Sequence, residues 1–102
     1  MSMSKPPLIY YAVTREQGEN WDASLTRREQ ENWDEHAAFM DALVDEGFAV
    51  LGGPIGDGTK VLLIFNAENE QAIEDRLADD PWTPMGLLRT IKVEPWEILL
   101  GA

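Results

Sequence analysis

WDEHAAFMDALVDEGFAVLGGP, residues 33–54, combines the pattern of an amphipathic helix with that of a short strand. At about 100° per residue, one face of the helix collects the large side chains, and the opposite face collects small and acidic ones. The first face holds Trp33, His36, Phe39, Met40, Leu43 and Val44. The only histidine of the chain is therefore predicted to lie on the core face of a helix that leads directly into a strand.

Three further strands are predicted from apolar runs. Together with the strand that follows Gly47, they cover residues 8–13, 48–51, 61–65 and 87–100. The second strand is predicted to end at Gly52-Gly53-Pro54, and the last to be interrupted at Pro95, because proline cannot donate a hydrogen bond to a sheet. Between the second and third strands, Asp57-Gly58 is typical of a hairpin turn.

A second helix is predicted over residues 68–78, with Asn66 as its N-cap. Thr26 and Glu29 have the spacing of a capping box, so the first helix is predicted to begin a few residues before Trp33. Residues 15–31 are predicted to form a long acidic connection that covers a site or is mobile.

The order of elements is strand, helix, strand, strand, helix, strand. It predicts an α+β fold of the ferredoxin-like βαββαβ class with an antiparallel sheet. Two helices cover only one face of such a sheet, yet residues 8–13 and 61–65 are apolar on both faces. An apolar surface left in water costs about 25 cal/mol per Å². The simplest cover is a second copy of the same sheet, so we expect a homodimer. We expect a single domain over residues 8–102 after a flexible tail at residues 1–7.

The composition excludes several classes of function. Among 102 residues there are 8 Lys plus Arg and 19 Asp plus Glu, which gives a net charge of −11. A field of this sign repels phosphate groups, so neither nucleic acid nor a membrane is expected as a partner. The lack of cysteine excludes disulfides, thiolate metal sites and cysteine nucleophiles. No apolar run approaches the roughly 20 residues that span a bilayer, and no hydrophobic signal segment is present. A cytoplasmic location is expected.

An ordered set of motifs resembles the signature of the YCII-related proteins. The motifs are His36, Gly53-Pro54, Asp80-Pro81 with Gly86, and Pro95-Trp96. The resemblance extends from about Leu8 to the C-terminus. It implies a dimeric α+β barrel of ferredoxin-like subunits and a site built from His36 and Asp80.

The resemblance does not imply a single activity. One characterised branch of the family removes chloride from a chlorinated hydroxyhydroquinone, and many members have no assigned substrate. Some relatives carry an arginine three residues before the histidine, where this chain has Trp33. This chain therefore lacks the arginine that would hold a substrate anion in those relatives, and Arg28 or its neighbour Arg27 is a candidate to take its place.

The pair of His36 and Asp80 suits proton transfer. Imidazole has an unperturbed pKa of about 6.5, so it can accept and donate a proton at neutral pH. A carboxylate bonded to one ring nitrogen orients the ring and leaves the other nitrogen for a substrate. No serine or cysteine nucleophile is in evidence. We therefore expect elimination, isomerisation or hydrolysis of a small organic molecule, aromatic or cyclic, by general acid–base catalysis.

Several aromatic residues are candidates for the lining of a binding pocket. Trp33 and Trp82 each lie near one member of the pair in sequence and suit a flat ring. Tyr10 or Tyr11 is a candidate for a hydroxyl contact, depending on which of them faces inward. No metal-ligand spacing is present, and no cofactor is expected. Haem is a minor alternative, because other dimeric α+β barrels bind it through a histidine.

Each candidate also has a structural interpretation. A histidine on an apolar helix face can be a core residue bonded to the backbone, and Asp80 before Pro81 has the spacing of an N-cap. Tryptophan in a small domain is often a core or interface residue. Two other functions therefore compete with an enzyme: a module that binds a small molecule without turnover, and a purely structural dimer.

Overall fold

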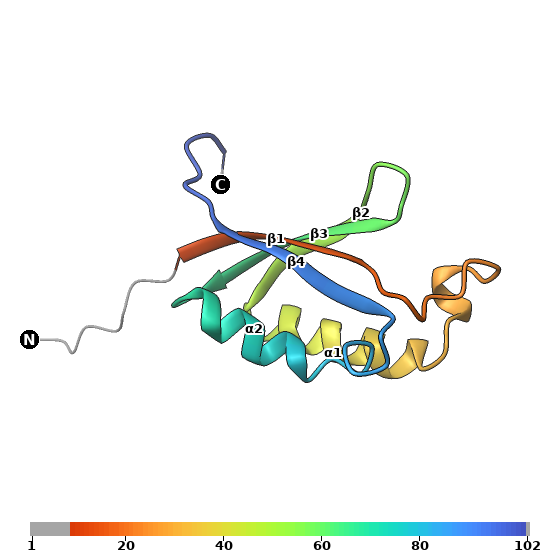
Figure 1. Ribbon diagram of the computed structural model, residues 1–102. Coiled ribbons are helices and arrows are strands. Elements are labelled where there is room, and N and C mark those ends of the chain that lie inside the picture. The colour runs from red at the N-terminus through yellow and green to blue at the C-terminus, as the bar shows by residue number, and fades with distance from the viewer. Residues whose placement is uncertain (1–8, 102) are drawn as a thin grey trace, which may run out of the picture.

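The computed structural model describes residues 9–101, which form a four-stranded antiparallel sheet with two helices on one face (Figure 1). The elements are β1 (Ile9–Gln17), α1 (Trp33–Asp45), β2 (Ala49–Ile55), β3 (Lys60–Ala67), α2 (Glu70–Ala78) and β4 (Leu88–Pro95). The strand order is β2-β3-β1-β4. The prediction of a ferredoxin-like βαββαβ fold is thereby confirmed. The tail predicted at residues 1–7 lies outside the described residues.

Three strands, β1, β2 and β3, are longer than the sequence pattern predicted, and β3 covers Lys60–Ala67 where residues 61–65 were predicted. β1 continues past Val13 to Gln17, and its buried residues Tyr11, Val13 and Arg15 alternate along one face. The prediction ended this strand too early because Thr14 and Arg15 are polar. β2 continues through Gly52-Gly53-Pro54 to Ile55, which the fold tolerates because β2 is an edge strand.

The predicted starts of both helices were wrong. α1 begins at Trp33. Thr26 is instead the N-cap of a separate 3₁₀ turn, η1 (Arg27–Glu29), and its N–H donates to Glu29 Oε1 at 2.8 Å. α2 begins at Glu70 and is capped by Asn69, whose side chain accepts a hydrogen bond from the Ala72 N–H at 2.8 Å. Asn66, the predicted cap, lies within β3.

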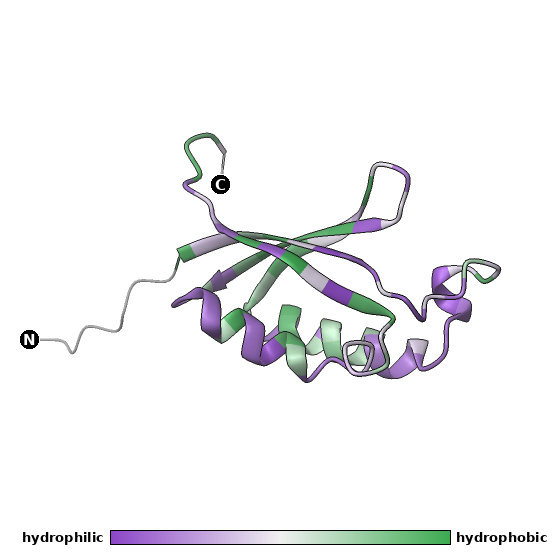
Figure 2. Cartoon of the chain, in the orientation of Figure 1, coloured by the Kyte–Doolittle hydropathy of each residue, from purple (hydrophilic) through white to green (hydrophobic). Residues whose placement is uncertain are grey.

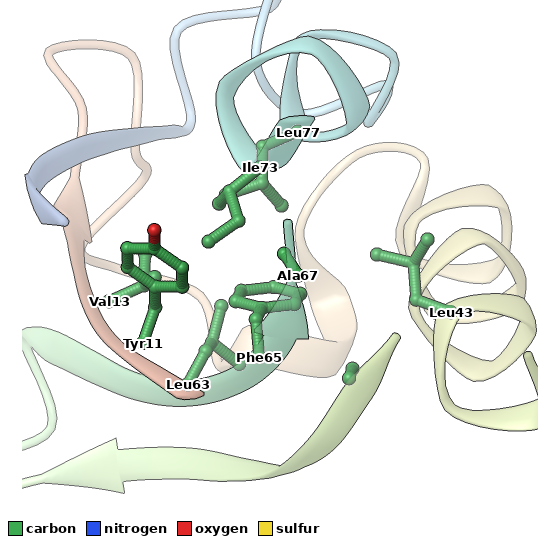
Figure 3. Packing of buried hydrophobic residues seen from close by; sticks show 9 residues of the cluster. Tyr11, Val13, Leu43, Leu63, Phe65, Ala67, Ile73 and Leu77 are labelled. Carbon is green, nitrogen blue, oxygen red and sulfur yellow. The ribbon is translucent and has the colours of Figure 1, made fainter. Parts of the chain in front are cut away.

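The core lies between the sheet and the two helices, and Figure 3 shows its packing. Its buried residues are Tyr11, Val13, Leu43, Ala49, Leu63, Phe65, Ala67, Ile73 and Leu77. From the predicted apolar face of α1, His36 and Leu43 are buried, whereas Val44 is exposed. A second small cluster of Trp82, Leu87 and Leu88 closes the end of the core that holds the start of α1.

The sheet face away from the helices carries a group of apolar side chains as well. The segment after β4 lies on this side (Figure 1), where the Trp96 N–H donates to Tyr10 O at 2.8 Å. A cavity of about 280 Å³ on this face is lined by Tyr10, Val50, Leu51, Ile64, Trp96, Ile98 and Leu100. Leu51 remains 63% exposed, and Figure 2 shows that the C-terminal segment is itself largely hydrophobic.

Candidate functional site

His36 and Asp80 are in direct contact. His36 lies in the first turn of α1 and is buried, and Asp80 follows α2 and is fully buried. The imidazole Nδ1 is 2.9 Å from Asp80 Oδ1 and 3.0 Å from Asp80 Oδ2. The fold thus brings together two polar side chains that are 44 residues apart in the sequence.

The carboxylate of Asp80 has donors on both oxygens. Oδ1 accepts a hydrogen bond from the Trp82 N–H at 3.0 Å, and Oδ2 accepts one from Arg15 Nη1 at 2.7 Å. No helix begins at Pro81, where the chain forms turns up to Gly86. Asp80 therefore bonds the backbone two residues ahead, as a capping aspartate does, and still reaches His36.

These contacts determine the charge of Asp80. Burial alone would raise the pKa of its carboxyl group, but the hydrogen bond and charge of His36, the Trp82 N–H and Arg15 outweigh burial and hold this pKa below its usual value. An ionised carboxylate only accepts hydrogen bonds, so the proton in the contact belongs to His36 Nδ1. Nε2 is then the ring nitrogen that remains for a ligand.

Arg15 is a site residue that the sequence analysis missed. It lies on the inner face of β1 with 1% of its surface exposed. Besides Asp80, it donates from Nη2 to Thr83 Oγ1 at 2.7 Å, and the Thr83 hydroxyl donates in turn to Leu77 O at 2.6 Å. Burial lowers the pKa of Arg15, although the hydrogen bond and charge of Asp80 oppose the shift. The alternation of Tyr11, Val13 and Arg15 is the signal that would have placed it inside.

Trp82 packs against one face of the His36 imidazole ring. Its ring stacks on His36 with centroids 3.9 Å apart and planes 5° apart, and its indole N–H donates to Glu31 O at 2.7 Å. Trp82 is fully buried and is not among the residues that line the cavity next to His36. It therefore fixes the ring plane of His36 and links it to the chain segment before α1.

A cavity of about 220 Å³ adjoins His36. Its lining comes from β1, η1, α1, β2, β3 and β4 and is mainly apolar: Arg15, Arg27, Trp33, His36, Met40, Gly52, Gly53, Pro54, Val61, Leu63 and Leu88. Gly52 is required in this wall, because a Cβ there would lie 2.4 Å from a methyl group of Leu63 and 3.1 Å from Leu62 O. The Gly53-Pro54 motif thus belongs to the same site as His36 and Asp80.

The other predicted pocket residues lie in different places. Trp33 is half-buried and lines the cavity, with its ring centroid 5.8 Å from that of His36. Arg28 lies over the Trp33 ring at 5.4 Å and is exposed, whereas its neighbour Arg27 lines the cavity. Tyr10 faces the opposite side of the sheet.

Tyr11 faces inward, where it belongs to the hydrophobic core. Within residues 9–101, no group of three or more His, Cys, Asp or Glu side chains is arranged to hold a metal ion. Neither α1 nor α2, the two α-helices of this range, has the length and apolar character needed to cross a membrane.

Comparisons with known proteins identify relatives of this fold and sequence. The family model of the YCII-related domain matches residues 9–97. A solved structure of 5-chloro-2-hydroxyhydroquinone dehydrochlorinase (TftG) from Burkholderia phenoliruptrix AC1100, in complex with 2,5-dihydroxybenzoquinone, is similar, with a TM-score of 0.65 and 28% sequence identity over 87% of this chain and 94% of that one. No curated protein sequence matches the chain.

Proposed function

This chain belongs to the YCII-related family, and from that premise we propose that it is an enzyme that transfers a proton on a small cyclic or aromatic molecule, with His36 as general acid–base and Asp80 as its orienting partner. One observation carries the proposal. The Nδ1 of His36 lies 2.9 Å from the buried carboxylate of Asp80, and His36 lines a mostly apolar cavity.

The proposed chemistry needs only the groups that meet at this wall. His36 Nε2 accepts a proton from an acidic O–H or C–H group of the substrate, and the released electron pair forms a C=O or C=C bond. In an elimination, the leaving group departs with its bonding electrons. In an isomerisation, the imidazolium returns the proton to a different atom. In a hydrolysis, the proton comes from a water molecule whose oxygen forms a bond to the substrate carbon, and the leaving group departs with its bonding electrons and takes the proton from the imidazolium. Asp80 stays ionised and stabilises the imidazolium.

The size of the cavity favours a molecule with one ring. A cavity of about 150 Å³ in an engineered protein holds benzene, so the 220 Å³ next to His36 suits a ring with a few substituents. The dehydrochlorinase of similar structure was solved with 2,5-dihydroxybenzoquinone, a single ring that carries oxygen. That likeness supports a ligand of the same general kind for this chain.

We also propose a homodimer joined through the sheet face that lies away from the helices. Leu51, Trp96 and Leu100 of that face are large apolar residues that remain exposed. A second copy of the same face, related by two-fold symmetry, would remove them from water on both subunits.

The test is a screen for turnover of hydroxylated and halogenated single-ring compounds, followed by release of halide and by the absorbance of the quinone products. We expect His36→Gln and Asp80→Asn to lower the rate of any activity found by about 100-fold or more. Asp79→Asn is the matched control, because it makes the same change at an exposed neighbour of Asp80. Unchanged rates in both site variants would contradict the proposal.

A binding module without turnover is the second candidate, favoured by the largely apolar lining of the cavity. A compound that raises the melting temperature and is recovered unchanged would support this candidate. Loss of that stabilisation in Trp33→Ala, a variant of the cavity wall, would place the bound compound next to His36.

A further inference from the structure

The charges around the cavity next to His36 differ from those of the whole chain. The chain has a net charge of −11, with 19 carboxylates against 8 basic side chains. The residues that line the cavity include Arg15, Arg27 and His36 and no aspartate or glutamate. An acidic protein therefore contains a pocket whose own charged groups are all basic.

The two arginines of this pocket are not equivalent. The guanidinium of Arg15 is paired with Asp80 at 2.7 Å, so its charge is already balanced. Among residues 9–101, Arg27 has no carboxylate within ion-pair distance, and the only hydrogen bond of its side chain runs from Nη2 to Gly58 O at 3.1 Å. Arginine has five N–H donors. Arg27 thus brings an unbalanced charge and unused donors to the pocket.

The neighbours of Arg27 fix the position of its guanidinium group. Burial lowers the pKa of Arg27, and no opposite charge compensates for that burial. The guanidinium lies over the ring of Trp21, 5.4 Å from its centroid. η1, which carries Arg27, is held by the buried side chain of Gln30, whose Nε2 donates to Asp22 O at 2.7 Å. The cation is therefore held at the cavity wall in advance of any ligand.

We propose that this cavity selects small organic anions, carboxylates or ring enolates, and that Arg27 binds the anionic group while the apolar wall receives the ring. The inference rests on the proposed function only in placing the ligand in this cavity. An anion would balance the charge of Arg27 and accept charge-assisted hydrogen bonds from it. Its ring would lie between Trp33 on α1 and Gly53-Pro54 on β2, within reach of His36.

The competing explanation is a purely structural one, in which Arg27 only fastens η1 to the β2–β3 hairpin through Gly58 O. The two explanations predict different behaviour of matched ligands. A fastening role affects charged and neutral ligands equally, whereas an anion-binding role affects only the charged one.

The experiment compares benzoate with benzamide, which have nearly the same shape and differ in charge, and repeats the comparison with cyclohexanecarboxylate and its amide. The ring-proton NMR signals of His36 report binding without assignment, because the chain has one histidine. We expect the carboxylates to bind about tenfold more tightly than the amides, as a hydrogen bond to a charged group implies. In Arg27→Gln this preference should fall to near unity.

Arg76→Gln is the matched control. It removes the same charge from α2, where Arg76 pairs with the exposed Glu46, and should keep the preference. Equal binding of acid and amide, a preference that survives Arg27→Gln, or no response of the His36 signals to any probe would overturn the inference. Since the readout is binding, anion selectivity without turnover would refute only the proposed function. Turnover of neutral substrates without dependence on Arg27 would refute only this inference.

Discussion

Polar side chains of proteins are usually exposed and apolar ones buried, and the two faces of the sheet depart from this rule in opposite ways. On the helix side, the inner face of the sheet, Arg15, His36 and Asp80 are polar and buried, and Asp80 lies at hydrogen-bond distance from each of the other two. On the far side, Leu51 and Leu100 are apolar and exposed. A buried polar group without partners costs free energy, so the hydrogen bonds that join these three side chains through Asp80 indicate a site held in a fixed geometry. An exposed apolar patch indicates a surface that meets another molecule.

The largest expected effect is a loss of stability when a substitution disrupts the polar cluster of Arg15, His36 and Asp80. Asp80→Leu leaves the guanidinium of Arg15 buried without its carboxylate, and we expect a loss of about 3–5 kcal/mol in the free energy of unfolding, measured by urea denaturation at fixed protein concentration. Asp80 is the better residue to replace, because in Arg15→Met the carboxylate would still have His36 as a partner.

Two controls make this prediction specific. Arg89→Met disrupts the ion pair between Arg89 and Glu16, which lies at the surface, and should change stability by less than about 1 kcal/mol. The double variant Arg15→Met with Asp80→Leu removes both charges and should be more stable than Asp80→Leu alone. A double variant no more stable than the single one would mean that Arg15 and Asp80 do not depend on each other.

An intermediate effect is expected on the outer face. Leu51→Asp places a charge on the proposed dimer surface, and we expect the dimer dissociation constant to rise about tenfold or more, because burial of a leucine contributes about 1.5–3 kcal/mol. Sedimentation equilibrium measures this change. Val44→Asp is the matched control, because Val44 is also exposed but lies on α1. If the two substitutions raise the dissociation constant equally, or if Leu51→Asp leaves it unchanged, the result would contradict a dimer formed through this face.

The sequence predicted the order of the elements and the pair of His36 and Asp80, but not all of the side chains around this pair. The order of elements follows from hydrophobic periodicity, and the contact of His36 with Asp80 agrees with the pair of residues that the resemblance to the family implied. Arg15 was missed because a polar residue ended the predicted strand, although the period of two continues through it. Trp82 was expected in the pocket but lies behind His36, since residues 81–86 form turns and no period gives side-chain directions there. Likewise, the period of two separates Tyr10 from Tyr11 without saying which one faces the core.

The smallest expected effect is a loss of stability at acid pH that comes from the protonation of Asp80. The pKa of Asp80 in the folded chain lies below its usual value, which is about 3.9 in an unfolded chain. The folded protein therefore binds this proton less readily than the unfolded one. The stabilisation by ionised Asp80 is complete above about pH 4 and is lost as the pH falls through the folded-state value.

The measurement that isolates this effect is the difference in unfolding free energy between the native protein and Asp80→Asn, followed from neutral to acid pH. Asp22, Glu29 and Asp57 also have lowered pKa values, owing to hydrogen bonds with Ser24, Thr26 and Thr59. These three carboxylates are present in both proteins, so their contributions cancel in the difference. We expect the difference to shrink as the pH falls below about 4. A difference that stays constant down to the lowest pH at which both proteins fold would mean that the donors around Asp80 do not hold it in its ionised form. The inner face would then lack the fixed charge that distinguishes it from the outer one.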